Sequence, residues 1–216
     1  MIIYLLSKLD SMSDCNRQLS SFMQKDIENK TILFIPTSPE DKAKTKKYAK
    51  GILEFFQRIN IKFEKSVILH SDLEKEEVTK EVKNSSVVFL MGGNTLSQYD
   101  FIVKKDLQSV LEDFEGVIVG LSAGAINACK KAIITPMHEV EDIHIYNGLG
   151  LVNISVEVHF EKNNLEQEQL VLDIAKETGQ EIYCIPDFSG IRIKESSTFF
   201  LGEVYRTSNN KIVKCY

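Results

Sequence analysis

The sequence contains no tryptophan and only four prolines and four cysteines among its 216 residues. No two cysteines stand at Cys-x-x-Cys spacing, so neither a zinc site nor a thioredoxin-like motif is indicated, and we expect free thiols in a reducing cytoplasm. No linker, low-complexity segment or internal repeat interrupts the chain. This favours one domain over residues 1–216.

The chain also lacks an excess of basic residues and any long apolar run. Its formal net charge is -5, which argues against a nucleic-acid partner, because such a partner requires a basic face. No apolar run approaches the roughly 20 residues of a membrane helix, and the first residues do not resemble a signal peptide. We therefore expect a cytoplasmic protein with no membrane partner.

Short apolar runs alternate with longer amphipathic segments. The segments 13–30 and 39–60 have apolar residues at helical spacing, and Ser38 and Pro39 resemble a helix start. Alternation of this kind predicts an α/β fold, with a mostly parallel sheet covered on both faces. The expected buried strands are 2–6, 31–35, 65–70, 86–92 and 116–121.

The last third of the chain has a different pattern of apolar and polar residues. Residues 153–160 alternate like a half-exposed strand, and 163–179 form a helical pattern that ends on a glycine. Beyond them we expect short strands joined by turns at "DFSG" (187–190) and "SNNK" (208–211).

One of the expected strands runs directly into "GLSAG" (120–124), and a helical segment follows. This is the context of a nucleophile elbow, in which a sharp turn exposes the serine, here Ser122, at the edge of the sheet. The amide of Ala123, at the start of the helix, would favour an oxyanion. The alternative is a strand–helix turn that merely prefers small residues.

A serine nucleophile needs a base, and the sequence offers His70, His138, His144 and His159. His159 ends a predicted strand, which would hold its side chain rigidly. Three carboxylates in the loop 135–151 could orient the imidazole: Glu139, Glu141 and Asp142.

A second glycine-rich turn, "MGGNT" (91–95), also follows a strand. The amides of Gly92 and Gly93 could supply the second oxyanion donor, and Asn94 could brace the loop through its side chain. The turn could also cradle a phosphate, but it lacks the Lys-Ser/Thr of a P-loop and the G-x-G-x-x-G of a dinucleotide site.

Together, "FLMGGNT", "GLSAGA" and "VEVHF" resemble the dipeptidase E-like serine peptidases, in the bacterial peptidase E branch of a group that includes cyanophycinase. The resemblance implies a three-layer α/β/α sandwich like the class I glutamine amidotransferases, with serine in place of their cysteine. It implies a serine peptidase that hydrolyses small peptides through an acyl-enzyme, with no metal or organic cofactor.

The resemblance also assigns roles within the expected site. Ser122 corresponds to the nucleophile and His159 to the base. The family places the acid fifteen to eighteen residues after the serine, which selects Glu139, with Glu141 and Asp142 as alternatives. The amides of Gly92 or Gly93 and of Ala123 would form the oxyanion hole. Independently of the resemblance, we expect Asn94 to contact the substrate.

One departure from the family concerns specificity. Peptidase E prefers an N-terminal aspartyl residue, and an Arg shortly after its catalytic His helps to bind that carboxylate. Here the segment after His159 has no Arg, and only Lys162 or Arg192 could substitute. We therefore expect weak activity on Asp-X dipeptides. Two other functions stay open: a small-molecule esterase or amidase, and a catalytically idle binding module.

Overall fold

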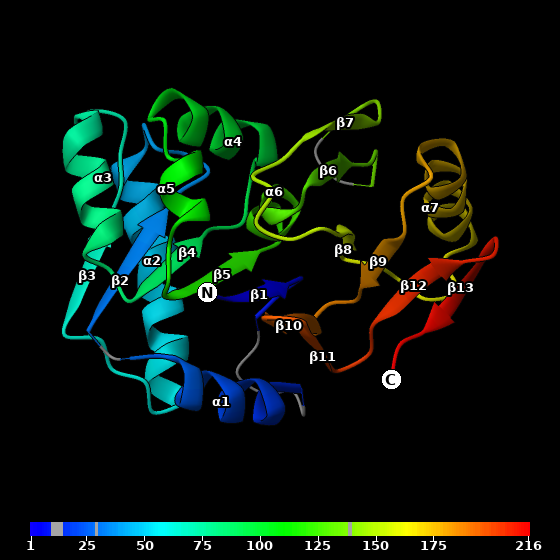
Figure 1. The fold of residues 1–216 in the computed structure, drawn as a ribbon, viewed down its shortest axis with the longest axis horizontal. Helices are drawn as coiled ribbons and strands as arrows, with labels where there is room; N and C mark the ends of the chain where they lie inside the picture. Colours follow the sequence, from blue (N-terminus) through cyan, green and yellow to red (C-terminus); the bar gives the residue numbers. More distant parts are fainter. Residues whose placement is uncertain (10–14, 29, 138–139) are drawn as a thin grey trace.

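The computed structural model describes residues 1–9, 15–28, 30–137 and 140–216. Its largest sheet has seven strands in the order β11-β10-β1-β5-β4-β2-β3 (Figure 1). Five strands are parallel, and two antiparallel strands extend the β1 edge. The parallel strands are β1 (Ile2–Leu6), β2 (Thr31–Ile35), β3 (Lys65–Ile68), β4 (Val87–Leu90) and β5 (Val117–Leu121); the antiparallel strands are β10 (Gly190–Lys194) and β11 (Ser197–Leu201).

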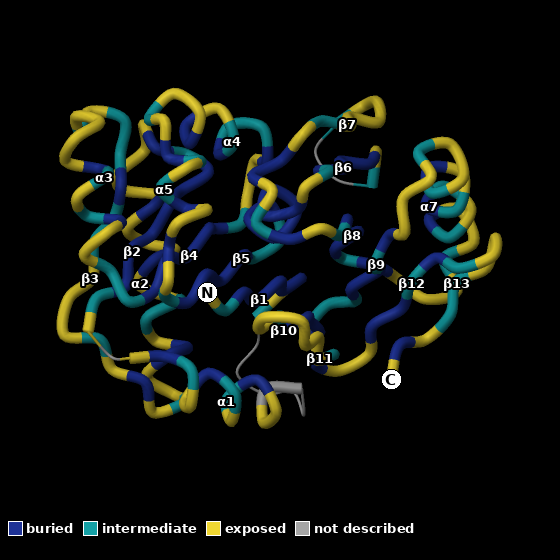
Figure 2. Tube along the Cα trace, viewed as in Figure 1, coloured by how far each residue is buried: buried dark blue, intermediate teal, exposed yellow. Residues whose placement is uncertain are grey.

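Helices cover both faces of this sheet, because successive strand residues point to opposite sides. Leu33 and Val88 pack in one core with the helices on their side, whereas Phe34 and Phe89 pack in a second core on the other. The central strands β1, β2, β4 and β5 are mostly buried, and the outer helix surfaces are exposed (Figure 2). The helices beside the first core are α3 (Lys75–Lys83), α4 (Thr95–Lys104), α5 (Gln108–Glu112) and α6 (Ala123–Ala128); those beside the second are α1 (Cys15–Asp26) and α2 (Lys42–Arg58).

A four-stranded sheet, in the order β13-β12-β9-β8, lies beside the main one. Its strands β8 (Ser155–Val158) and β9 (Ile182–Ile185) are parallel, and α7 (Leu165–Thr178) packs on it through Val171 and Ile174. The remaining strands are β12 (Tyr205–Ser208) and β13 (Lys211–Lys214), together with the hairpin β6 (Lys131–Ile134) and β7 (His144–Asn147).

The three-layer α/β/α arrangement with a mostly parallel sheet is confirmed, and two local expectations are wrong. Helix α2 begins at Lys42 rather than near Ser38, because Asp41 is the cap and its carboxylate accepts from the Lys44 amide. Strand β8 is buried along its whole length rather than half-exposed. Its one charged residue, Glu157, is accommodated because Thr135 and Gln167 donate to it.

No helix within the described ranges is long and apolar enough to cross a membrane.

Candidate active site

Ser122 occupies the sharp turn between β5 and α6. Its backbone has φ 50° and ψ -108°, a sparsely populated conformation for a residue with a side chain. Such strain costs on the order of 1–3 kcal/mol and persists only where the surroundings impose it. Here the Ser122 amide donates to the Leu6 carbonyl, and the Ser122 carbonyl accepts from Ala125 and Ile126. The turn is therefore held from both sides.

The small residues of this turn are required by close packing. A Cβ atom placed on Gly124 would lie 2.2 Å from the carbonyl oxygen of Leu90 in the neighbouring strand β4. No real Cβ tolerates that approach, so glycine lets α6 pack directly against the sheet. This contact explains the last glycine of the "GLSAG" motif.

His159 lies against the serine from the other sheet. It directly follows β8 and has a positive φ of 54°. Its Nε2 lies 2.9 Å from Ser122 Oγ, within hydrogen-bond distance. The strand end therefore presents the imidazole to the hydroxyl, as the sequence suggested.

The other ring nitrogen of His159 contacts Asp187, which follows β9 by two residues. The distance from Nδ1 to Asp187 Oδ1 is 2.6 Å. A carboxylate accepts only, so Nδ1 carries the proton and Nε2 is left to accept from the Ser122 hydroxyl. Burial alone would raise the pKa of Asp187, but hydrogen bonds from His159 and Lys8 outweigh it and hold the pKa below its ordinary value. The carboxylate is therefore ionised at neutral pH.

Ser7, which follows β1 and is 1% exposed, connects these groups. Its hydroxyl accepts from the backbone amide of His159 at 2.8 Å and donates to Asp187 Oδ1 at 3.2 Å. It also lies 3.4 Å from His159 Nδ1. One buried hydroxyl thus fixes both the imidazole's backbone and the carboxylate that orients its ring.

The expected acid, Glu139, lies outside the described residues, as does His138. Glu141 and Asp142 are exposed, and neither hydrogen-bonds to His159. Sequence reasoning missed both Asp187 and Ser7. The signal that could have found them is the one that selected His159, a polar side chain just after an apolar strand.

The glycine turn after β4 lies against Ser122. A Cβ on Gly92 would be 3.5 Å from that of Ser122. Gly93 has φ 126°, and a Cβ there would meet the hydroxyl oxygen of Thr37 at 2.3 Å. The same hydroxyl donates to the Gly92 carbonyl, so Thr37 fixes the turn. Within the described chain, the amides of Gly92, Gly93 and Ala123 donate to no protein acceptor.

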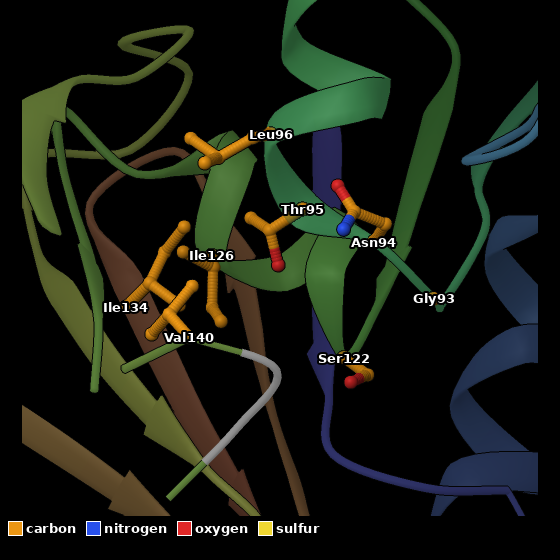
Figure 3. Close-up of a pocket in the computed structure, with 8 residues that line it drawn as sticks. All are labelled: Gly93, Asn94, Thr95, Leu96, Ser122, Ile126, Ile134 and Val140. Atoms are coloured by element: carbon orange, nitrogen blue, oxygen red, sulfur yellow. The ribbon is translucent and has the colours of Figure 1, made fainter. Parts of the chain in front are cut away.

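A cavity of about 150 Å³ opens beside Ser122 (Figure 3). Asn94 lines it and caps α4, since its side-chain oxygen accepts from the Ser97 amide. The predicted bracing of this loop is confirmed. Apolar side chains gather on the side of the cavity away from the serine: Leu96, Ile126, Ile134 and Val140.

Arg192 and Lys162, the two candidates to replace the family's substrate-binding arginine, are both paired with carboxylates. The Nε and Nη2 groups of Arg192 donate to Asp26, at 2.6 and 2.8 Å, and its guanidinium lies over the rings of Phe22 and Phe199. Lys162 pairs with Glu168.

A family model described as peptidase family S51 matches residues 4–201. The chain belongs to peptidase family S51. This family, that of peptidase E, makes the protein a serine peptidase. No curated protein sequence matches the chain.

Two crystal structures show that this S51 peptidase shares its fold with known proteins. A peptidase from an acI-B1 actinobacterium aligns with TM-score 0.65 and 14% identity, over 99% of this chain and 96% of the other. A protein proposed to be a peptidase E, from Listeria monocytogenes EGD-e, aligns with TM-score 0.65 and 18% identity, over 96% and 98%. The class I glutamine amidotransferase-like fold expected from the sequence is confirmed.

Proposed function

We propose that this S51 peptidase is a dipeptidase or exopeptidase that cleaves small peptides through a Ser122–His159–Asp187 triad. The observation that carries the proposal is the continuous hydrogen-bonded chain from Asp187 through both ring nitrogens of His159 to Ser122 Oγ. Asp187 takes the role that the sequence suggested for Glu139. We further propose that residues 1–216 act as one catalytic domain.

In the proposed mechanism, His159 Nε2 removes the hydroxyl proton as Ser122 Oγ attacks the scissile carbonyl. The Asp187 carboxylate stabilises the imidazolium that forms and keeps Nε2 aimed at the serine. His159 then gives its proton to the departing amine, which leaves an acyl-enzyme. Water, activated by the same imidazole, hydrolyses the ester and restores the serine.

The amides of Ala123 and of Gly92 or Gly93 are the proposed oxyanion donors. They adjoin the nucleophile and are unused by the described chain, so they are free to bind the charge that develops on the carbonyl oxygen. Removal of one such donor typically costs about 10²–10³ in kcat.

The cavity beside Ser122 supports a small apolar side chain as its occupant. Its volume is about 150 Å³, and none of the described residues that line it is charged. Asn94 uses its oxygen for the helix cap, so its amide nitrogen is the group left to contact substrate. Among the described residues, this lining offers no cation to an N-terminal aspartyl side chain.

Covalent labelling tests the function. A fluorophosphonate probe should modify Ser122 in the wild type, as mapped by mass spectrometry, and Ser122→Ala should lose labelling and about 10³-fold or more of dipeptide hydrolysis. A folded Ser122→Ala that keeps more than about a tenth of the activity would rule out this nucleophile. Labelling with hydrolysis of esters but of no peptide would favour the esterase alternative, and no labelling would favour the binding module.

A further inference from the structure

A second cavity, of about 320 Å³, lies against the same glycine turn. Its apolar part is formed by Ile52, Met91 and Leu121, and its polar part includes Ser38 and Lys44. A volume of this order suits a small-molecule group, and a mostly apolar wall with a few polar groups is typical of a binding pocket.

This cavity adjoins the nucleophile. Leu121 directly precedes Ser122, and a Cβ atom built on Gly92, which also lines the cavity, would be in van der Waals contact with that of Ser122. A dipeptide has a C-terminal carboxylate and, if its first residue is aspartyl, a side-chain carboxylate. The carbon of either group is separated from the scissile carbonyl carbon by two intervening atoms, so it lies about 4 Å away. A peptide carbonyl on Ser122 therefore leaves a neighbouring carboxylate within reach of this cavity.

Among the described residues, Lys44 is the only charged one that lines the cavity. It forms no ion pair with any described residue, although Lys42 and Lys50 on the same helix pair with Asp72 and Glu54. The Ser38 hydroxyl likewise donates to no described acceptor. An unpaired ammonium and an unused hydroxyl on an apolar wall suit an anionic group.

Three of the residues that line the cavity lie on one side of α2. Lys44, Tyr48 and Ile52 are four residues apart, so they project from the same side of α2. Tyr48 is 59% exposed, and no described aromatic ring packs on it. It therefore offers a ring to whatever occupies the cavity.

We propose that this cavity is a substrate subsite in which Lys44 binds a carboxylate of the peptide. The inference rests on the proposed function and extends it. The carboxylate has two possible sources, the free C-terminus of the leaving residue and an acidic side chain at the N-terminus. The role of Lys44 is specificity, since it does not touch the triad.

Two pairs of substrates test the subsite by kcat/KM. Ala-Leu and Ala-leucinamide differ only in the C-terminal charge, whereas Asp-leucinamide and Asn-leucinamide differ only in the N-terminal side chain. We expect Lys44→Gln to lower kcat/KM about tenfold or more for the charged member of at least one pair and less than about threefold for its neutral partner. The affected pair identifies the source. Lys46→Gln, on the same helix but outside the cavity, is the matched control.

Equal losses for both members of each pair, or no loss at all, would overturn the proposal. Calorimetric titration of Ser122→Ala protein, with and without Lys44→Gln, measures the same preference without turnover. If the wild type hydrolyses none of the four compounds, the proposed function fails. Tighter binding of a charged member that depends on Lys44 would still support the subsite, and its absence would overturn the subsite as well.

Discussion

At the residue scale, the site consists of side chains that stand one or two positions beyond a strand. Ser7, Ser122 and His159 directly follow β1, β5 and β8, and Asp187 follows β9 by two residues. Parallel strands bring their carboxyl ends to one edge, where loops hold side chains without filling the core. The hydrogen bonds among these four residues join the two sheets at that edge.

Ser7 provides a test of positioning. We expect Ser7→Ala to lower kcat about tenfold or more with little change in KM, because the imidazole and the carboxylate lose a shared anchor while substrate contacts remain. Steady-state kinetics and a melting curve check this together. An unchanged kcat would contradict the role. A fall in kcat that follows the loss of folded protein would show that Ser7 is only structural.

Gly93 and Gly51 form a matched pair of glycines. Gly93→Ala must tolerate φ 126° and a clash with Thr37, so we expect it to displace the turn and lower kcat by about 10² or more. A Cβ on Gly51, within α2, meets nothing within 4 Å. Gly51→Ala should therefore keep full activity and gain about 0.5–1 kcal/mol in urea unfolding. Normal activity in Gly93→Ala would show that the turn does not supply an oxyanion donor.

The sequence predicted part of this site. Ser122 and His159 were found because a motif and a strand end both mark them. Asp187 was missed because the turn that aims it requires a positive φ at Phe188 and the packing of β9 beside β8, neither of which has a local pattern. Glu139 was selected from the family's spacing between the serine and the acid, which contains no information about that turn.

At the scale of elements, a buried ion pair fastens α1 to the sheet. Asp26 on α1 and Arg192 on β10 are each 6% exposed, and Tyr4 on β1 donates to the same carboxylate at 2.5 Å. Burial alone would raise the pKa of Asp26, but hydrogen bonds from Arg192 and Tyr4 outweigh it and lower that pKa. Because Arg192 is committed here, it serves structure rather than substrate.

The lowered pKa of Asp26 predicts how the free energy of unfolding depends on pH. Near neutral pH, Asp26→Asn should lose about 3 kcal/mol in urea unfolding, because it leaves Arg192 buried without its counter-charge. The pKa of Asp26 is lower in the folded chain than in the unfolded chain, where it is about 3.9, so the ionised carboxylate stabilises the fold above that pH. This stabilisation is lost as the pH falls through the folded-state pKa. The gap between wild type and variant should therefore shrink below about pH 4. A constant gap would show that the charge is not responsible.

Elements with a strong repeating pattern were predicted well. All five parallel strands were expected from apolar runs, which are typical of strands buried on both faces. The edge strand β3 followed the same pattern although none of its residues is buried. The exceptions arise from competition between polar groups. Asp41 rather than Ser38 caps α2, because its carboxylate accepts from the Lys44 amide. Glu157 is buried within β8, where Thr135 and Gln167 donate to it.

At the scale of the molecule, the proposed function depends on how the two sheets meet. The main sheet supplies the proposed nucleophile, the glycine turn and Ser7, whereas the smaller sheet supplies the proposed base and acid. Neither sheet holds a triad alone. A sequence shows each strand end but not which ends adjoin, so the pairing of Asp187 with His159 required the structure.

The most direct test is to compare the two candidate acids in one assay. With a dipeptide substrate, the account predicts that Asp187→Asn loses about 10²–10⁴ in kcat, because the imidazole loses its orientation and its tautomer. It predicts that Glu139→Gln stays within about threefold of the wild type. A crippled Glu139→Gln beside a near-normal Asp187→Asn would contradict the Ser122–His159–Asp187 triad.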